Sequence, residues 1–281
     1  MHLGQIRWQG QVRAAIFEDG CARPVSEYTM ADLIARSEKE GDPLPDVARR
    51  LASIHSEDAP PIIPLMPREV WACGCTYETS ASFRDSEHGT REGFYSHVHR
   101  SERPEIFFKG TARVCVGPRR DIGIRADSKF TAPEPELAVV LGQQGRIIGY
   151  TLANDVSAWD IERENPLYLP QSKVYQACCA LGPVIVTADQ LPAVNNLTMT
   201  CAIQRGTETI FSGETSTSRL NRTVGSLIDF LLRSNPVPAG SVLLTGTGII
   251  VPETAALAPG DVVRISVPEI GELVNTATIV R

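Results

Sequence analysis

Short apolar runs separated by Gly, Pro, Asn and Asp dominate the chain from Val70 onward, which is the pattern of short strands joined by turns. Apolar residues recur at helical spacing over residues 224–233 behind Thr223, so one helix is expected to interrupt the strands. The pattern predicts an α+β fold that is rich in β-structure. The expected strands cover residues 112–116, 137–141, 147–153, 183–187, 197–203, 242–245, 262–267 and 273–280.

The beginning of the chain has a different pattern, in which strand and helix signals alternate. Residues 11–17 predict a strand that ends in a turn at residues 18–20. Residues 30–40 predict a helix that begins after Thr29, a residue type that commonly caps helices. We therefore expect a small α/β module at the N-terminus.

A connector rich in proline follows this module. Prolines punctuate residues 59–67, a composition typical of an extended linker. The predicted boundary gives a small N-terminal domain over residues 1–66 and a larger domain over residues 67–281. With 281 residues, of which 42% are hydrophobic, the chain is long enough to bury a large core.

Charge and composition exclude several classes of partner. The formal net charge is −6 and the isoelectric point about 5.5, without a run of Lys or Arg, so we expect neither a nucleic acid nor an anionic membrane surface as a partner. No apolar stretch has the length of a membrane span, and the first residues lack the pattern of a signal peptide. We expect a cytoplasmic protein.

Two glutamates, Glu134 and Glu136, come just before the apolar run 137–141. Two apart in an extended segment, they project from the same face of one strand, so both carboxylates can reach one cation. Asp155 follows 19 residues after Glu136, across a predicted turn and a second strand that can return it alongside. An all-oxygen set of three carboxylates suits Mg²⁺, Mn²⁺ or Ca²⁺. The alternative is a solvated strand face, where Glu-x-Glu pairs are common.

The neighbouring residues favour the metal site over the solvated face. The run 137–141 is continuous rather than alternating, as in a strand buried on both faces, and such a strand does not readily carry two unpaired carboxylates. Pro135 cannot donate a ladder hydrogen bond, so we expect it at a strand end or a sheet rim. We therefore expect a cation to meet the two glutamates.

Five motifs in one order resemble the signature of the fumarylacetoacetate hydrolase superfamily, over the chain from about residue 70 onward. The resemblance implies a mixed β-sandwich roll, a divalent cation that is usually Mg²⁺, and a homodimer or homotetramer. It places the metal ligands at Glu134, Glu136 and Asp155. The motifs are Glu134-Pro-Glu-Leu-Ala-Val-Val-Leu-Gly142, Gly149-Tyr-Thr-Leu-Ala-Asn-Asp-Val-Ser-Ala-Trp-Asp160, Leu181-Gly-Pro183, Leu244-Thr-Gly-Thr247 and Pro259-Gly-Asp261.

Further segments are similar to one branch of this superfamily, the dehydratases of 2-keto-3-deoxy sugar acids. These segments are Arg103–Lys109 and Asp160–Lys173, and Gly248 points the same way because the hydrolase branches usually carry proline at this position. The resemblance implies a hydro-lyase, dependent on a divalent metal, that converts a 2-keto-3-deoxy pentonate to 2,5-dioxopentanoate through a metal-stabilised enolate. It also implies that Lys173 and Glu105 are the catalytic pair.

The implied reaction needs a metal and two proton-transfer groups. A 2-oxo acid offers a carboxylate oxygen and a keto oxygen to one hard cation, which stabilises the charge that develops when C3 loses a proton. An acid must then protonate the departing C4 hydroxyl. A desolvated lysine near a cation has a lowered pKa, which suits Lys173. The alternative for Lys173 is an ordinary surface lysine. The alternative for Glu105 is a salt bridge to Arg103 or Lys109. Lys109 itself is expected next to the site, where it balances charge.

Four further residues are candidates for binding the substrate. Thr245 and Thr247 bracket a glycine and can offer hydroxyl and backbone donors to substrate oxygens, with a plain turn as the alternative. Tyr77 and Arg84 are weaker candidates for the tail of the substrate, and either can instead be structural.

A small-molecule 2-oxo acid is thus the expected partner, and two other functions use the same metal. One is a C–C hydrolase or decarboxylase acting on acylpyruvate-like 2-oxo acids. The other is a non-catalytic, metal-bound sensor of 2-oxo acids, because a fold does not guarantee chemistry. The segment 164–173 and Gly248 favour the dehydratase. Trp159 departs from the family, which usually carries arginine there, so any ion pair made by that guanidinium is absent.

Overall fold

The architecture is known from a computed structural model, which describes residues 1–87 and 93–281. Strands form most of it. They are β1 (His2–Trp8), β2 (Gln11–Glu18), β3 (Cys21–Pro24), β4 (Val70–Gly74), β5 (Glu105–Gly110), β6 (Cys115–Val116), β7 (Ile122–Arg125), β8 (Thr131–Ala132), β9 (Pro135–Leu141), β10 (Ile147–Asp155), β11 (Ser157–Ala158), β12 (Cys179–Thr187), β13 (Thr198–Arg205), β14 (Glu208–Ser216), β15 (Ser241–Leu244), β16 (Val262–Val267) and β17 (Gly271–Val280).

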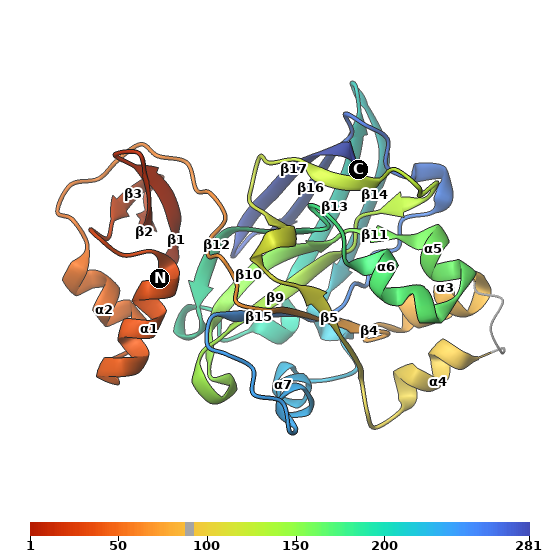
Figure 1. The fold of residues 1–281 in the computed structure, drawn as a ribbon, viewed down its shortest axis with the longest axis horizontal. Helices are drawn as coiled ribbons and strands as arrows, with labels where there is room; N and C mark the ends of the chain where they lie inside the picture. Colours follow the sequence, from red (N-terminus) through yellow and green to blue (C-terminus); the bar gives the residue numbers. More distant parts are fainter. Residues whose placement is uncertain (88–92) are drawn as a thin grey trace.

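The strands form two large sheets and one small one (Figure 1). A ten-stranded sheet runs in the order β3-β2-β1-β12-β10-β9-β15-β4-β5, with β6 pairing to β12. A five-stranded sheet, ordered β14-β13-β16-β17-β7, packs against it, and β8 pairs with β11 separately. This confirms the predicted α+β, β-rich fold, with two sheets packed as in a mixed β-sandwich roll.

Helices occupy the flanks of the sheets. In Figure 1, α1 and α2 lie beside β1–β3, while α3 to α6 gather at the opposite side of the molecule. Among the described helices, none combines the length and apolar content that crossing a membrane requires. The α-helices are α1 (Met30–Glu40), α2 (Leu44–Leu51), α3 (Glu78–Glu87), α4 (Phe94–Arg100), α5 (Trp159–Glu164), α6 (Leu169–Lys173) and α7 (Val224–Leu232).

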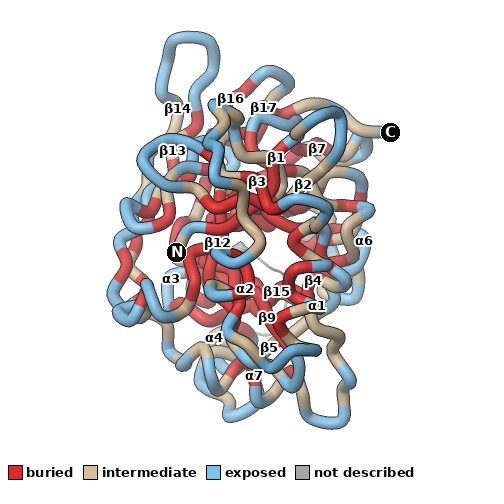
Figure 2. Tube along the Cα trace, turned by 90° about the vertical axis from the view of Figure 1, so that its left-hand side faces the viewer, coloured by how far each residue is buried: buried red, intermediate tan, exposed pale blue. Residues whose placement is uncertain are grey.

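Strand β9 is buried on both faces, as its continuous apolar run predicts. Leu137, Val139 and Leu141 pack into the core between the two large sheets. Ala138 and Val140 point to the other face and join a second core that includes residues of α1 and α2. Figure 2 shows the resulting band of buried chain through the middle of the molecule. The strand that carries Glu136 is therefore held from both sides.

The N-terminal elements continue the main sheet. Strand β1 pairs antiparallel with β12, with His2 opposite Val186 and Leu3 opposite Ile185. Hydrogen bonding thus runs without interruption from β3 to β5. The division of the chain into domains at residues 66 and 67 stays a prediction.

Both helices expected from the sequence form at the predicted positions. Thr29 caps α1 through a capping box with Asp32, and the helix ends at Gly41, whose φ of 74° suits glycine. Thr223 caps α7 by accepting a hydrogen bond from the backbone N–H of Ser226 at 3.1 Å.

Two sequence-based expectations about the larger part were wrong. Residues 112–116 were expected to form a strand, but Ala112–Val114 is a 3₁₀ turn and only the two residues of β6 pair. One helix was expected after residue 70, whereas the described residues also form α3 to α6. These helices are five to ten residues long, and α3 has only two apolar residues, Ala81 and Phe83, so helical periodicity does not reveal them.

Candidate active site

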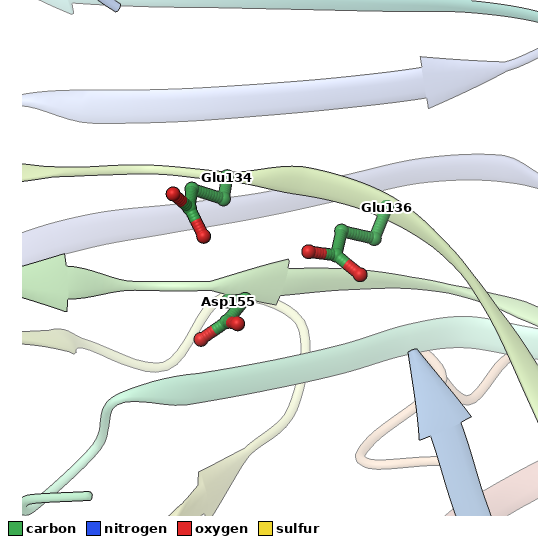
Figure 3. A group of neighbouring side chains, drawn as sticks. All are labelled: Glu134, Glu136 and Asp155. Carbon is green, nitrogen blue, oxygen red and sulfur yellow. The ribbon is translucent and has the colours of Figure 1, made fainter. Parts of the chain in front are cut away.

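Three carboxylates meet where β9 and β10 lie side by side (Figure 3). One oxygen from each of Glu134, Glu136 and Asp155 lies within 4.8 Å of the others. The exposed fractions of the three residues are 5%, 1% and 1%. This arrangement is a group that can hold one metal ion, and it is not a solvated strand face.

The antiparallel pairing of β9 with β10 creates this meeting point. Glu136 lies opposite Ala153 and Pro135 lies opposite Asn154. The backbone N–H of Asp155 donates to the carbonyl of Glu134 at 2.9 Å, so the pairing extends one residue beyond Pro135. The alternation of side chains then places all three carboxylates on one face of the sheet. Pro135 is the first residue of β9, as predicted for a residue that cannot donate in a ladder.

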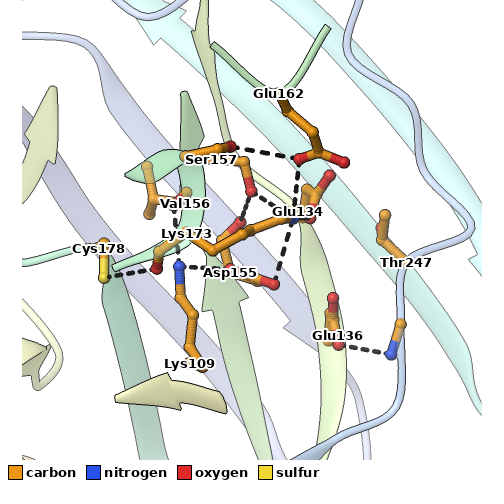
Figure 4. A network of polar contacts seen from close by, with 12 residues as sticks. Lys109, Glu134, Glu136, Asp155, Val156, Ser157, Glu162, Lys173, Cys178 and Thr247 are labelled. Carbon is orange, nitrogen blue, oxygen red and sulfur yellow. Dashed lines mark hydrogen bonds and ion pairs between the residues drawn. The ribbon is translucent and has the colours of Figure 1, made fainter. Parts of the chain in front are cut away.

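Two buried lysines flank the carboxylates (Figure 4). The Nζ of Lys173, at the end of α6, donates to Oε2 of Glu134 at 2.5 Å and to Oγ of Ser157 at 2.7 Å, and it lies 3.4 Å from Oδ2 of Asp155. The Nζ of Lys109, on β5, lies 2.5 Å from Oδ1 of Asp155. Lys173 is 1% exposed and is therefore not a surface lysine.

Burial and charge shift the pKa of every group in this cluster. Burial raises the pKa of Glu134 and raises that of Glu136 well above its ordinary value, and the charge of Asp155 adds to both shifts. Burial opposes ionisation of Asp155 as well, but Lys109 and Lys173 outweigh it and lower the pKa of this carboxyl. Asp155 is therefore held as a carboxylate, while Glu136 is the acid that ionises least readily.

The pKa of Lys173 does not follow the sequence-based expectation. A lowered pKa was expected because the lysine is desolvated. Burial does act in that direction, but the charges of Asp155 and Glu134 outweigh it and raise the pKa. The expectation omitted these two carboxylates, which lie in contact with the ammonium group.

Glu136 differs from the other two carboxylates in its partners. Its Oε2 accepts a hydrogen bond from the backbone N–H of Gly246 at 2.5 Å, but among the described residues no lysine or arginine forms an ion pair with it. A buried carboxylate without a cation is costly. The donor set, all oxygen and containing one carboxylate that lacks a positive partner, fits a hard divalent cation.

The threonines of the 245–247 segment lie beside Glu136 with their hydroxyls engaged locally. Thr245 Oγ1 donates to the carbonyl of Leu137 at 2.9 Å, and Thr247 Oγ1 donates to the carbonyl of Ile249 at 3.2 Å. The turn between them carries Gly246, whose φ is 93°. The segment thus forms a tight turn next to the carboxylates.

Glu105 and Arg84 form an ion pair at the edge of this cluster. Oε2 of Glu105 lies 3.1 Å from Nη1 of Arg84, and the Glu105 side chain is 21% exposed. The pairing with Arg103 or Lys109 that the sequence left open does not occur. The Glu105 carboxylate occupies space that a Cβ on Gly74 would fill, because that atom would lie 2.0 Å from Oε2. Tyr77, the other tail-binding candidate, is 3% exposed, and burial raises its pKa.

A cavity of about 420 Å³ lies beside Glu105. Its polar lining includes Glu105 and Glu162, and its apolar lining comes from α4 and from the segment that joins α5 to α6. A larger cavity of about 710 Å³ lies next to the first residues of the chain and is lined by Met1, Glu18 and Pro60 among others, away from the carboxylates. The smaller cavity thus reaches Glu105, one of the candidate catalytic pair, while Lys173 is not among its lining residues.

Sequence reasoning missed Glu162 and Ser157. Glu162 lies on α5, is 1% exposed and pairs with Arg84 at 3.1 Å. Ser157 accepts the hydrogen bond from Lys173. Glu162 is one of several acids in a short charged stretch, and nothing in the local pattern distinguishes it from its solvated neighbours.

The family of the chain follows from a comparison of its sequence. Residues 80–278 match the family described as fumarylacetoacetate (FAA) hydrolase C-terminal, which is more than half of the chain. The chain belongs to the fumarylacetoacetate hydrolase family. The resemblance drawn from the five motifs is confirmed. Glu136 lies on β9 and Asp155 on β10, and Glu134 comes immediately before β9.

Similar members of the fumarylacetoacetate hydrolase family include two dehydratases. The chain is 44% identical to 2-dehydro-3-deoxy-D-arabinonate dehydratase of Saccharolobus solfataricus, over 75% of this chain and 72% of the relative. It is 37% identical to a probable 2-keto-3-deoxyxylonate dehydratase of Haloferax volcanii, over the whole of both. A solved structure of 2-keto-3-deoxy-D-arabinonate dehydratase complexed with magnesium and 2,5-dioxopentanoate matches the whole of both chains with a TM-score of 0.84 and 36% identity.

Proposed function

We propose that this protein is a hydro-lyase that removes water from a 2-keto-3-deoxy pentonate and forms 2,5-dioxopentanoate, with Mg²⁺ held by Glu134, Glu136 and Asp155. The observation that carries the proposal is the buried trio of carboxylates, of which Glu136 lacks a positive partner among the described residues. The similarity to dehydratases supports the choice of substrate class. Mn²⁺ and Ca²⁺ share the preference for oxygen ligands.

The residues around the trio supply the remaining chemistry. When bound, the divalent cation withdraws electrons from the 2-oxo acid and favours loss of a proton from C3. Lys173 and Glu105 are the proton-transfer pair: one takes the C3 proton and the other gives a proton to the departing C4 hydroxyl, so that one water leaves and a C3=C4 double bond forms. Tautomerisation, in which C5 and its hydroxyl each lose a proton while C3 and C4 each gain one, then gives the C5 aldehyde of 2,5-dioxopentanoate. The turn at Thr245 and Thr247, together with Tyr77 and Arg84, binds the rest of the substrate. In this proposal the protein forms a homodimer or homotetramer and acts in the cytoplasm.

Incubation with two substrate classes tests the proposal. With Mg²⁺, the protein should convert 2-keto-3-deoxypentonate to a product that is lighter by one water and carries an aldehyde, both of which mass spectrometry and NMR detect. Removing the metal with a chelator should stop the reaction, and K173M should lower kcat by about 10²-fold or more. Release of pyruvate from acylpyruvates, with the pentonate left intact, would contradict the proposal and favour a C–C hydrolase.

A further inference from the structure

Glu162 lies beside Lys173 (Figure 4), and Arg84 connects it to Glu105, the other group proposed to transfer protons. Its Oε1 is 3.1 Å from Nη2 of Arg84, and its Oε2 is 3.8 Å from Nζ of Lys173. Oε2 also accepts a hydrogen bond from Oγ of Ser172 at 3.3 Å. The residue is 1% exposed, so its side chain is held from several sides in one orientation.

Arg84 extends this contact to Glu105. Its guanidinium, on a residue that is 2% exposed, pairs with Glu162 through Nη2 and with Glu105 through Nη1, each at 3.1 Å. The rings of Trp159 and Tyr95 lie 5.5 and 5.6 Å from its Cζ. Alternating charges therefore run from Glu105 through Arg84 and Glu162 to Lys173. Trp159, which stands in place of the arginine common in the family, packs against this other arginine.

Glu162 differs from the other acidic partners of Lys173 because it is not a proposed metal ligand. Among the described residues, three carboxylates pair with its Nζ, those of Glu134, Asp155 and Glu162. The first two are proposed metal ligands, so their charge is shared with the cation when it is bound. Glu162 is the partner outside the ligand set, and its attraction for the ammonium group is undiminished in the loaded enzyme.

We infer that Glu162 is a positioning residue, which holds the ammonium group of Lys173 and, through Arg84, the carboxylate of Glu105 in the geometry that the two proton transfers require. The inference rests on the proposed function for the identity of the two groups. Lysine and glutamate side chains have many rotamers, and a misplacement of about 1 Å is enough to cost roughly 10²-fold in rate. A fixed carboxylate that contacts one group directly and the other through a rigid guanidinium removes that freedom.

The variant E162Q tests this inference because the amide keeps the shape and an accepting oxygen but removes the charge. We expect kcat to fall by roughly 10- to 100-fold, with KM changed by less than about 3-fold. Titration calorimetry with Mg²⁺ alone should give a Kd within about 3-fold of the wild-type value, since Glu162 is not a ligand. A raised KM with unchanged kcat would overturn the inference and make Glu162 a substrate-binding residue.

The variant D160N is the matched control. Asp160 lies on the same helix and accepts hydrogen bonds from Oγ of Ser128 and the backbone N–H of Lys129, both at 2.7 Å, so its role is structural. D160N should lower the melting temperature while kcat stays within about 2-fold of wild type. Equal losses of kcat in D160N and E162Q, in proportion to their losses of stability, would reduce Glu162 to a structural role and overturn the inference.

Exchange of the pyruvate methyl protons in D₂O separates this inference from the proposed function. Pyruvate carries the same 2-oxo acid group, and its exchange needs only removal of a C3 proton. NMR should show metal-dependent exchange with wild-type protein and exchange slowed by roughly 10- to 100-fold with E162Q. If the wild type exchanges pyruvate but leaves the pentonate intact, the proposed function fails while slowed exchange in E162Q still supports the positioning role. Exchange by E162Q at the wild-type rate, or no exchange by the wild type, overturns the inference.

A second variant covers the case in which E162Q does not fold. S172A removes only the hydroxyl that donates to Glu162 and leaves every charge in place. We expect it to slow both turnover and exchange by about 2- to 5-fold, with metal affinity unchanged. Wild-type rates of both in S172A, together with an E162Q that is unfolded, would overturn the inference.

Discussion

Lys109 and Asp155 form an ion pair that is shielded from water, with 2.5 Å between Nζ and Oδ1 and side-chain exposed fractions of 0% and 1%. Lys109 also donates to the carbonyl of Val156 at 3.1 Å. Burial disfavours the ammonium form of this lysine, but Asp155 outweighs burial and raises its pKa. Lys109 thus compensates the charge of a candidate metal ligand. It comes before Asp155 in the chain, whereas Lys173, the other lysine that contacts this carboxylate, comes after it.

Replacing Lys109 with methionine should destabilise the protein most when no metal is present. The change leaves Asp155 buried with one fewer cation, and removal of one partner of a buried pair costs about 3–5 kcal/mol. Added Mg²⁺ should recover part of this loss. Urea unfolding with and without a chelator measures both effects. K39M, which removes an exposed lysine at the end of α1, is the control and should change the free energy of unfolding by less than about 0.5 kcal/mol. An unchanged unfolding free energy in K109M would show that the pair contributes nothing.

Replacing Glu136 with glutamine should have opposite effects on the metal-free and the metal-bound protein. Burial and the neighbouring charges of Asp155 and Glu134 raise the pKa of Glu136, so its ionised form destabilises the metal-free protein near neutral pH. We expect E136Q to raise the melting temperature without metal. At a Mg²⁺ concentration of 100 Kd the free energy of unfolding of the wild type should rise by about 2.7 kcal/mol. At the same concentration that of E136Q should rise much less. Equal stabilisation of both proteins by Mg²⁺ would remove Glu136 from the metal site.

Gly248 should be required for the position of Tyr77. A Cβ at residue 248 would lie 2.5 Å from Cδ1 of Tyr77 and 2.5 Å from Oγ1 of Thr215. G248A therefore forces the tyrosine ring to move, and overpacking of this kind costs about 1–3 kcal/mol. We expect kcat/KM to fall by about 10-fold. In the double variant with Y77A the part of the cost of G248A that comes from the ring should disappear, which a double-mutant cycle detects, while the contact with Thr215 remains.

Gly225 provides the matched control for this substitution. It lies on α7, where a Cβ would have its nearest neighbour at 3.9 Å. G225A should keep wild-type activity and add up to about 1 kcal/mol of stability, as expected for alanine in a helix. Wild-type activity in G248A as well would show that the ring of Tyr77 is free to move without consequence.

Asp261 should contribute to stability at neutral pH and lose that contribution in acid. Burial acts against its ionisation, but the hydrogen bonds from Arg205, at 2.8 and 2.9 Å, and from the N–H of Ala258 outweigh it and lower its pKa below 3.8. A carboxyl with a lowered folded-state pKa stabilises the protein above its unfolded pKa, and this contribution is lost as the pH falls through the folded value. The difference in unfolding free energy between wild type and D261N should be largest above about pH 5 and should shrink as the pH falls below 3.8. A difference that stays constant between pH 7 and pH 3.5 would contradict this prediction.

The sequence predicts much of the sheet structure and the meeting of the three carboxylates because both depend on local periodicity. Glu134 and Glu136 are two apart on a strand whose apolar run is continuous, and one short turn returns Asp155 beside them. The roles assigned to Lys173, Glu105 and the substrate-binding residues stay predictions. For Lys173, the structure adds a buried location in contact with Glu134.

Contacts between distant segments are the part that the sequence does not predict. Arg84 meets Glu162 across 78 positions of the chain, and Glu162 belongs to a short helix with no clear amphipathic pattern. The direction of the pKa shift at Lys173 likewise depends on which carboxylates surround it in space. Local patterns specify which strands form, whereas these contacts follow from how the ends of the strands and the short helices assemble.

The pairing of β1 with β12 has a consequence for shortened forms of the protein. A chain cut at the proline-rich connector would leave the backbone groups of β12 near Ile185 and Val186 without their hydrogen-bonding neighbour. An open edge of this kind recruits strands from other molecules and promotes aggregation. The first strand, far from the carboxylates, therefore protects the sheet that carries them.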